Sequence, residues 1–121
     1  MAVILIVEDD VFTREIAVMM IQDWGYQTLS ASSVEEALVL LRSPQDIDAL
    51  FTDIYLKKEM LGGCDLAHHA VKLRPNLRVL YTTGNAITDK MKAMLVAGTH
   101  LLPKPYAPEQ LHHSVDEMLA A

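Results

Sequence analysis

The stretch ILIVEDD, residues 4–10, joins an apolar run to an acidic cluster. Four aliphatic residues in succession are typical of a strand that is buried on both faces of a sheet. The run ends abruptly in three carboxylates, which belong to Glu8, Asp9 and Asp10. Because neighbouring carboxylates repel one another, this cluster is costly unless a positive group lies beside it. The stretch therefore predicts a buried strand that ends at a charged site.

Length and composition indicate one globular domain. The chain has 121 residues, of which 51% are hydrophobic, which suffices for a core and is too apolar for disorder. The single cysteine, Cys64, excludes an internal disulfide and a cysteine-rich zinc site. A net charge of −6 argues against nucleic acid as a direct partner. Since no apolar run has the length of a membrane span or the flanks of a signal peptide, we expect no membrane insertion and a cytoplasmic protein.

Strand-like and helical patterns alternate five times along the chain. Short apolar runs between turn residues indicate strands, and apolar residues at helical spacing with capping signals indicate helices. The predicted strands are residues 3–7, 26–31, 48–52, 77–83 and 99–102. The predicted helices are residues 11–24, 33–42, 63–73, 87–97 and a last one from about residue 107.

Two helices carry more detailed expectations. The first predicted helix has Phe12, Ile16, Met19 and Met20 on one face, an apolar face of the kind that packs on a core. The fourth is expected to run until Gly98 stops it, because glycine readily adopts the left-handed backbone that ends a helix.

Strict alternation with short connections predicts a mainly parallel, doubly wound sheet with helices on both faces, which is a three-layer α/β sandwich. Pro103 cannot donate to a strand ladder, so the strand at residues 99–102 is expected at an edge. Sites in such sheets lie beyond the carboxyl ends of the strands. The residues that directly follow each strand are therefore the candidates for function.

Charged and hydroxyl side chains follow four of the five predicted strands. Glu8 and Asp9 follow the first strand and Asp53 ends the third, while Thr83 ends the fourth and Lys104 follows the fifth. Carboxylate oxygens in incomplete number suit Mg²⁺, which keeps waters and often shares a phosphate. Each residue alone has a simpler role as a helix cap, a loop residue, a strand former or a solvated lysine. Their joint placement at one edge of one sheet favours a single site.

The chain resembles, over essentially its whole length, the receiver domain of bacterial two-component response regulators. The motifs VED (7–9), FTDIYL (51–56), TTG (82–84) and KPY (104–106) carry the resemblance, because they occur in the family's order and spacing. It implies a flavodoxin-like (βα)5 fold with strand order 2-1-3-4-5. From the length of the chain we also expect one receiver domain over residues 1–121 without an output domain, either as a stand-alone protein or as part of a hybrid kinase.

The resemblance implies a phosphoacceptor and a metal site. Asp53 would accept a phosphoryl group from a phosphohistidine on a sensor histidine kinase or a histidine phosphotransfer protein. Glu8, Asp9 and Asp53 would hold Mg²⁺ together with the backbone carbonyl of Tyr55. Such a protein is a signalling phosphoacceptor with self-phosphorylating and self-dephosphorylating activity rather than an ordinary enzyme.

The remaining motif residues would contact the phosphoryl group and transmit its presence. Thr83 would hydrogen-bond one phosphoryl oxygen and Lys104 would pair with another, while Pro105 would follow a cis peptide bond that aims the lysine. The phosphorylated domain would then contact a downstream protein target or pass the phosphoryl group on.

The sequence departs from the family pattern at two places. Lys57 stands where the family often has proline, in a loop that is one residue longer than usual and ends in Gly62 and Gly63. Leu101 stands where the family usually has a switch aromatic, three residues before Lys104. We therefore expect the change on the face of the fourth helix, fifth strand and fifth helix to be smaller or to use other residues.

Three alternatives belong to other classes of function. A pseudo-receiver would keep the fold as a phosphorylation-independent protein-binding module, and Leu101 supports this interpretation. An aspartyl-nucleophile phosphatase would need a second aspartate two residues after Asp53, where Tyr55 stands. A nucleotide-binding protein would need a glycine-rich phosphate loop after the first strand, which the sequence lacks.

Overall fold

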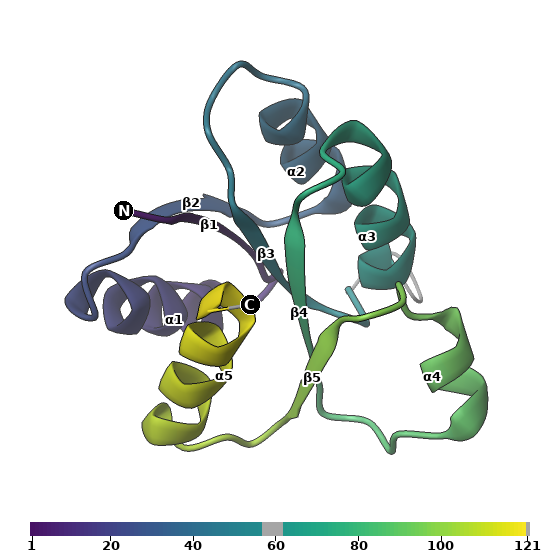
Figure 1. The fold of residues 1–121 in the computed structure, drawn as a ribbon. Helices are drawn as coiled ribbons and strands as arrows, with labels where there is room; N and C mark the ends of the chain where they lie inside the picture. The colour runs from purple at the N-terminus through teal and green to yellow at the C-terminus, as the bar shows by residue number, and fades with distance from the viewer. Residues whose placement is uncertain (57–61, 121) are drawn as a thin grey trace.

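The computed structural model describes residues 1–56 and 62–120. Within these residues, five parallel strands form one sheet in the order β2-β1-β3-β4-β5. The strands are β1 (Val3–Val7), β2 (Gln27–Ala31), β3 (Ala49–Asp53), β4 (Arg78–Thr83) and β5 (His100–Pro103). The helices that alternate with them are α1 (Val11–Asp23), α2 (Val34–Leu41), α3 (Gly62–Leu73), α4 (Asp89–Met94) and α5 (Pro108–Ala120) (Figure 1).

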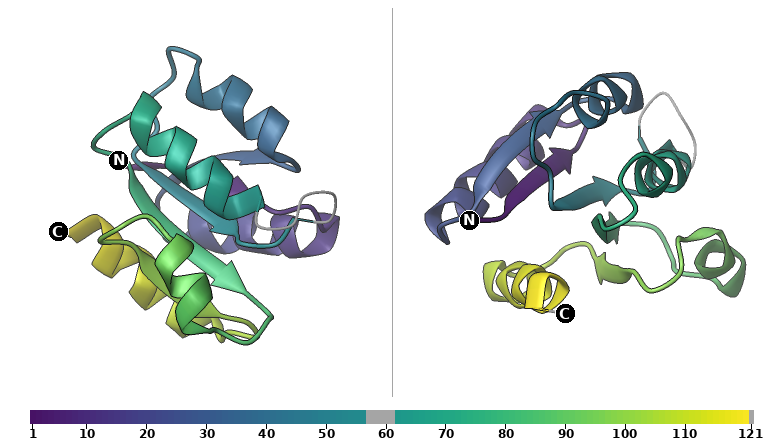
Figure 2. Two further views of the ribbon diagram at one scale, coloured as in Figure 1. Left: turned by 90° about the vertical axis from the view of Figure 1, so that its right-hand side faces the viewer. Right: turned by 45° about the horizontal axis from the view of Figure 1, so that its top comes forward.

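The predicted flavodoxin-like fold is confirmed in its strand order and its three layers. α1 and α5 cover one face of the sheet, and α2 and α3 lie side by side on the other (Figures 1 and 2). β5 is an edge strand and ends at Pro103, as the missing N–H of proline led us to expect. In the described part of the chain, no helix is long and apolar enough to cross a membrane.

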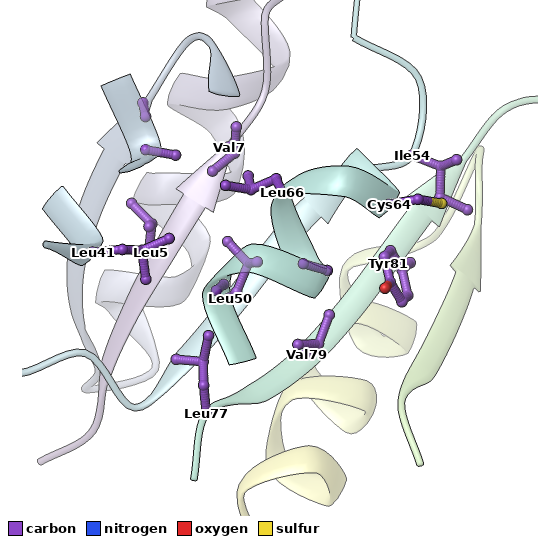
Figure 3. Packing of buried hydrophobic residues seen from close by; sticks show 14 of the residues in the cluster. Leu5, Val7, Leu41, Leu50, Ile54, Cys64, Leu66, Leu77, Val79 and Tyr81 are labelled. Carbon is purple, nitrogen blue, oxygen red and sulfur yellow. The ribbon is translucent and has the colours of Figure 1, made fainter. Parts of the chain in front are cut away.

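The core is divided in two by the sheet, because side chains alternate between the faces of a strand. In β1, Leu5 and Val7 pack under α2 and α3, whereas Ile4 and Ile6 pack under α1 and α5. Figure 3 shows the first of these clusters, in which Tyr81 from β4 is the largest side chain. Burial on both faces explains why the inner strands β1, β3 and β4 appear in the sequence as short, largely apolar runs.

The expected inner face of α1 was wrong for three of its four residues, since only Met20 packs, partly buried, against the core. The side chains of Phe12, Ile16 and Met19 are 79%, 56% and 62% exposed, whereas Ala17 and Ile21 are buried against the sheet. Apolar residues extend almost around this helix, so their spacing did not identify the buried side. The small Ala17 lets the helix approach the sheet closely, and this leaves the larger side chains on the outer face.

The fourth helix is shorter than predicted and does not run to Gly98. It begins after Thr88, whose hydroxyl caps the helix by accepting a hydrogen bond from Met91 N. It ends because Leu95 is extended, with φ −78° and ψ 153°. Gly98 has a φ of 76° and lies in the turn that leads to β5, not at the end of the helix.

Candidate functional site

Lys104 joins two buried carboxylates at the carboxyl end of the sheet. Its Nζ atom donates hydrogen bonds to Asp53 Oδ2 at 2.7 Å and to Glu8 Oε1 at 2.8 Å. Glu8 is 6% and Asp53 8% exposed, so both charges are largely removed from water. Burial by itself lowers the pKa of Lys104, but the hydrogen bonds to the two carboxylates outweigh it and raise the pKa above its ordinary value. The lysine is therefore a permanent cation inside the site.

Parallel strands bring these residues together, because all their carboxyl ends lie at one edge of the sheet. Glu8 directly follows β1, Asp53 is the last residue of β3 and Lys104 directly follows β5. The backbone N–H of Lys104 also donates to the Thr83 carbonyl at 2.8 Å, which fixes the start of the loop after β5. The peptide bond between Lys104 and Pro105 is cis.

The carboxylate of Glu8 lies in an environment that resists its ionisation. Burial raises the pKa of Glu8 above its ordinary value, the contact with Lys104 opposes this, and the nearby carboxylates of Asp9 and Asp53 raise it further. The backbone carbonyl of Glu8 accepts a hydrogen bond from Arg14 Nη1 at 2.8 Å. Arg14 therefore holds the turn between β1 and α1 and places positive charge beside its carboxylates.

The three successive carboxylates that follow β1 have separate roles. Asp10 caps α1, since its Oδ2 atom accepts hydrogen bonds from Thr13 N at 2.8 Å and from Thr13 Oγ1 at 2.7 Å. Glu8 points to Lys104, and Asp9 is partly exposed beside Glu8. The simpler explanation of the acidic cluster as a helix cap therefore holds for Asp10 alone.

The predicted magnesium ligands are of the atom type that this metal prefers. Glu8, Asp9 and Asp53 offer hard carboxylate oxygens at one edge of the sheet, and such oxygens are what Mg²⁺ prefers. In the described ranges, no group of three or more histidine, cysteine, aspartate or glutamate side chains is already arranged to hold a metal ion. The ammonium of Lys104 bridges Glu8 and Asp53 instead. The magnesium site stays a prediction.

Thr83 ends the strand next to that of the acceptor Asp53, and Tyr55 follows Asp53 by two residues. Thr83 is 1% exposed, and its Oγ1 atom accepts a hydrogen bond from Asn85 N at 3.1 Å. The backbone N–H of Tyr55 donates to Asp53 Oδ1 at 3.2 Å, so one backbone donor and one ammonium hold the two oxygens of the acceptor. Beside the lysine, Thr13, Gly84, Lys104, Pro105 and Tyr106 line an open hollow of about 460 Å³.

The sequence pattern did not identify two residues beside the site. Gly63 lies in the first turn of α3, close to the helix start that its position predicted, and it approaches the backbone of Asp53, a contact that the pattern did not predict. Thr82 is buried beside the site, and its hydroxyl has no hydrogen-bond partner among the residues described. The glycine pair was the available signal for Gly63, and no pattern distinguished Thr82 from an ordinary strand residue. The departure at Lys57 and the longer loop fall on residues 57–61, outside the described residues.

Residues 4–116 match the family model of the response regulator receiver domain. The chain belongs to this family. Receiver domains are signalling phosphoacceptors of two-component systems and not ordinary enzymes, which confirms the class that the motifs suggested.

Among curated proteins, the chain is 30% identical to the sensor kinase CckA of Brucella abortus over 121 residues, which are 98% of this chain and 12% of CckA. It is 26% identical to the response regulator receiver protein CpdR of the same organism over 98% of this chain and 97% of CpdR. The chain spans an eighth to a half of the sensor kinase CckA, the regulator AlgB and the response regulator SaeR.

Solved structures agree in fold over the whole chain. A response regulator receiver protein from Sinorhizobium medicae WSM419 has a TM-score of 0.90 and 27% identity, with 99% of this chain and 95% of that chain covered. A receiver domain from the hybrid histidine kinase CckA has a TM-score of 0.80 and 27% identity, with 98% of this chain and 99% of that chain covered. Receivers that stand alone and receivers within kinases thus both resemble this chain.

Proposed function

We propose that this receiver accepts a phosphoryl group on Asp53 from a phosphohistidine of a sensor histidine kinase or a histidine phosphotransfer protein. The contact of Lys104 Nζ with Asp53 Oδ2 at 2.7 Å carries the proposal, since it places a permanent cation where phosphoryl charge would arrive. A buried ion pair is weak support for stability alone, because burying both charges costs about as much as their attraction returns. The arrangement is better explained by chemistry at the carboxylate.

The transfer needs little covalent chemistry from the protein. One oxygen of Asp53 attacks the phosphorus, the bond from phosphorus to the imidazole nitrogen breaks, and its electron pair stays on the nitrogen. The product is an acyl phosphate, which water later hydrolyses. Lys104 and the hydroxyl of Thr83 neutralise and orient the phosphoryl oxygens, which is the main contribution of proteins to phosphoryl transfer.

Glu8, Asp9, Asp53 and the backbone carbonyl of Tyr55 would hold Mg²⁺ in this proposal. When bound, the ion would neutralise part of the charge on the phosphoryl oxygens. Glu8 would then share its oxygens between the metal and Lys104, and the cation would relieve the repulsion between Glu8 and Asp9.

The kinase would dock on the exposed face of α1. Phe12, Ile16 and Met19 form an apolar stripe on the helix that starts next to the acidic cluster. Thr13, on the same helix, lines the hollow beside Lys104. Helices of a partner commonly bind such apolar surfaces, and this position would bring a phosphohistidine to the acceptor. The downstream protein, the onward transfer and the cytoplasmic location stay predictions.

Acetyl phosphate with Mg²⁺ provides the direct test. Mass spectrometry should find the mass of one added phosphoryl group on the wild type and none on Asp53→Asn. Asp46→Asn, an exposed loop substitution of the same chemistry, is the matched control and should be phosphorylated like the wild type. Phosphorylation of Asp53→Asn at the same rate would contradict the assignment of the acceptor.

The phosphorylation-independent module is the second candidate, and Leu101 in place of a switch aromatic favours it. Beryllofluoride, a mimic of the phosphoryl group, separates the two. A receiver with a working site takes it up in the presence of Mg²⁺, and a module that has lost the switch does not.

A further inference from the structure

Tyr81 of β4 is fully buried under the helices on one face of the sheet (Figure 3). Its hydroxyl oxygen accepts a hydrogen bond from the backbone N–H of Val96 at 3.1 Å. Burial raises the pKa of Tyr81 to about 12, so the hydroxyl is neutral at physiological pH. An uncharged acceptor inside the core is thus used to hold a backbone group that lies 15 residues further along the chain.

Val96 lies just beyond the C-terminal end of α4. The helix ends at Met94, and the extended Leu95 leads the chain away from it. His68 of α3 donates from Nε2 to the Met94 carbonyl at 2.8 Å, and Thr99 Oγ1 donates to the Val96 carbonyl at 2.8 Å. The end of α4 is therefore held by side chains from β4 and α3.

The segment before α4 is also attached to β4. Thr83 Oγ1 accepts from Asn85 N at 3.1 Å, directly beside the acceptor site. Thr83 and Tyr81 are two residues apart in one strand, so their side chains lie on the same face with Cα atoms roughly 7 Å apart. Hydroxyl groups of one strand thus hold both ends of the segment from Asn85 to Val96.

We propose that Tyr81 is the positioning residue that couples the phosphoacceptor site to the C-terminal end of α4, an inference that rests on the proposed function. When the Thr83 hydroxyl turns to a phosphoryl group on Asp53, it gives up the hydrogen bond from Asn85 N. The segment then shifts, and the Val96 N–H leaves Tyr81. The bound and released positions of Val96 are the two states that phosphorylation biases.

The neighbouring strand β5 has no hydroxyl group beside Tyr81 that could make the same hydrogen bond. Leu101 of β5 pairs with Tyr81 in the sheet register, and it is aliphatic and offers no hydroxyl. Leu101 packs as a partly buried residue against the same cluster as Tyr81. The hydroxyl that can respond to a movement of α4 therefore comes from β4.

Coupling between two sites is reciprocal, which makes the proposal measurable. If phosphorylation breaks the bond from Val96 to Tyr81, a protein without that bond is already biased to the phosphorylated form. Tyr81→Phe keeps the ring and removes the acceptor. Since a neutral hydrogen bond contributes modestly to stability, we expect Tyr81→Phe to bind beryllofluoride between about twofold and tenfold more tightly than the wild type.

Two measurements test the inference on the full chain. Amide exchange by NMR should show that the Val96 N–H of the wild type exchanges faster after addition of beryllofluoride and Mg²⁺. Tyr81→Phe should show the faster exchange without beryllofluoride and the tighter binding. Tyr26→Phe is the matched control, because it loses a hydroxyl bond to Asp116 on the α1 and α5 side, and it should bind beryllofluoride like the wild type.

The possible failures are distinguishable. Unchanged exchange of Val96 in the beryllofluoride-bound wild type overturns the coupling, and so does equal affinity of Tyr81→Phe and wild type. A wild type that takes up no beryllofluoride overturns the proposed function and this inference with it. If Tyr81→Phe does not fold, the exchange of Val96 in the wild type decides alone.

Discussion

A Cβ atom on Gly63 would overlap the backbone carbonyl oxygen of Asp53. The first turn of α3 therefore packs directly against the backbone of the acceptor residue. The N–H of Gly63 also donates to the Ile54 carbonyl at 3.0 Å, which joins the start of α3 to the end of β3. Only glycine allows this approach, since the nearest atoms belong to the backbone and cannot rotate away.

Gly63→Ala should therefore destabilise the protein. The added methyl group forces α3 and the end of β3 apart, and overpacking of this kind costs about 1–3 kcal/mol. Urea denaturation measures the loss. Gly84→Ala is the matched control, because a Cβ there meets nothing closer than Lys104 Cβ at 3.9 Å. Equal stability of the two variants would show that α3 can move without cost.

The orientation of α1 predicts a small loss of stability for substitutions of its exposed apolar residues and a large loss for a buried one. Phe12→Ala and Ile16→Ala should change the free energy of unfolding by less than about 0.5 kcal/mol, because both side chains are exposed. Ile21→Ala should cost about 2–5 kcal/mol, because it leaves a cavity under the helix. Denaturation curves of the three variants check the assignment, and a large loss for Phe12→Ala would contradict it.

The exposed apolar face of α1 should determine how fast a kinase phosphorylates the protein. Phe12→Ala should slow transfer from a purified histidine kinase that phosphorylates the wild type, because the variant loses an exposed aromatic side chain from the proposed docking surface. Its phosphorylation by acetyl phosphate should be unchanged. Val39→Ala removes an apolar side chain that is 64% exposed on α2. The kinase should phosphorylate this control variant at the rate of the wild type. Equal kinase rates for all three proteins would remove α1 from the docking surface.

Most of the fold could be predicted from the sequence, because the inner strands β1, β3 and β4 are short, largely apolar runs that are mostly buried. Strand positions and the edge position of β5 followed from local pattern and from Pro103. The buried face of α1 did not, since apolar residues extend almost around the helix. The end of α4 did not either, because a long-range hydrogen bond from Val96 to Tyr81 replaces the helical pattern there.

The candidate site could be predicted as a set of residues but not as a set of contacts. Topology alone brings Glu8, Asp53 and Lys104 to one edge, so their order in the chain was sufficient. Glu8 was expected as a magnesium ligand, which stays a prediction, and its ion pair with Lys104 in the structure was not expected. The partner of a carboxylate depends on side-chain rotations that move its oxygens by a few ångströms. The spacing of residues in the sequence carries no such information. The close approach of Gly63 to Asp53 depends on helix placement in the same way.

Alkaline pH should destabilise the protein partly through Tyr81. Burial raises the pKa of Tyr81 from its ordinary value of 10.0 to about 12, so the folded state keeps the proton where the unfolded state loses it. The stability that this group contributes is therefore fully present below pH 10 and is lost as the pH rises towards 12, at up to about 1.4 kcal/mol per pH unit. Tyr81→Phe should lose less stability than the wild type in this window. Parallel pH profiles from urea denaturation would contradict the shift.

Thr82→Val should stabilise the protein. The Thr82 hydroxyl is buried and, within the described residues, has no hydrogen-bond partner, which costs about 1–3 kcal/mol relative to a satisfied or absent hydroxyl. Valine has the same shape without the polar atom, and Thr82→Ser serves as the control because it keeps the hydroxyl. Urea denaturation should show a gain of about 1 kcal/mol for valine and none for serine. A loss of stability for valine would mean that the hydroxyl binds water in the small cavity that Thr82 lines together with Glu8 and Asp53, and that the floor of the acceptor site is hydrated.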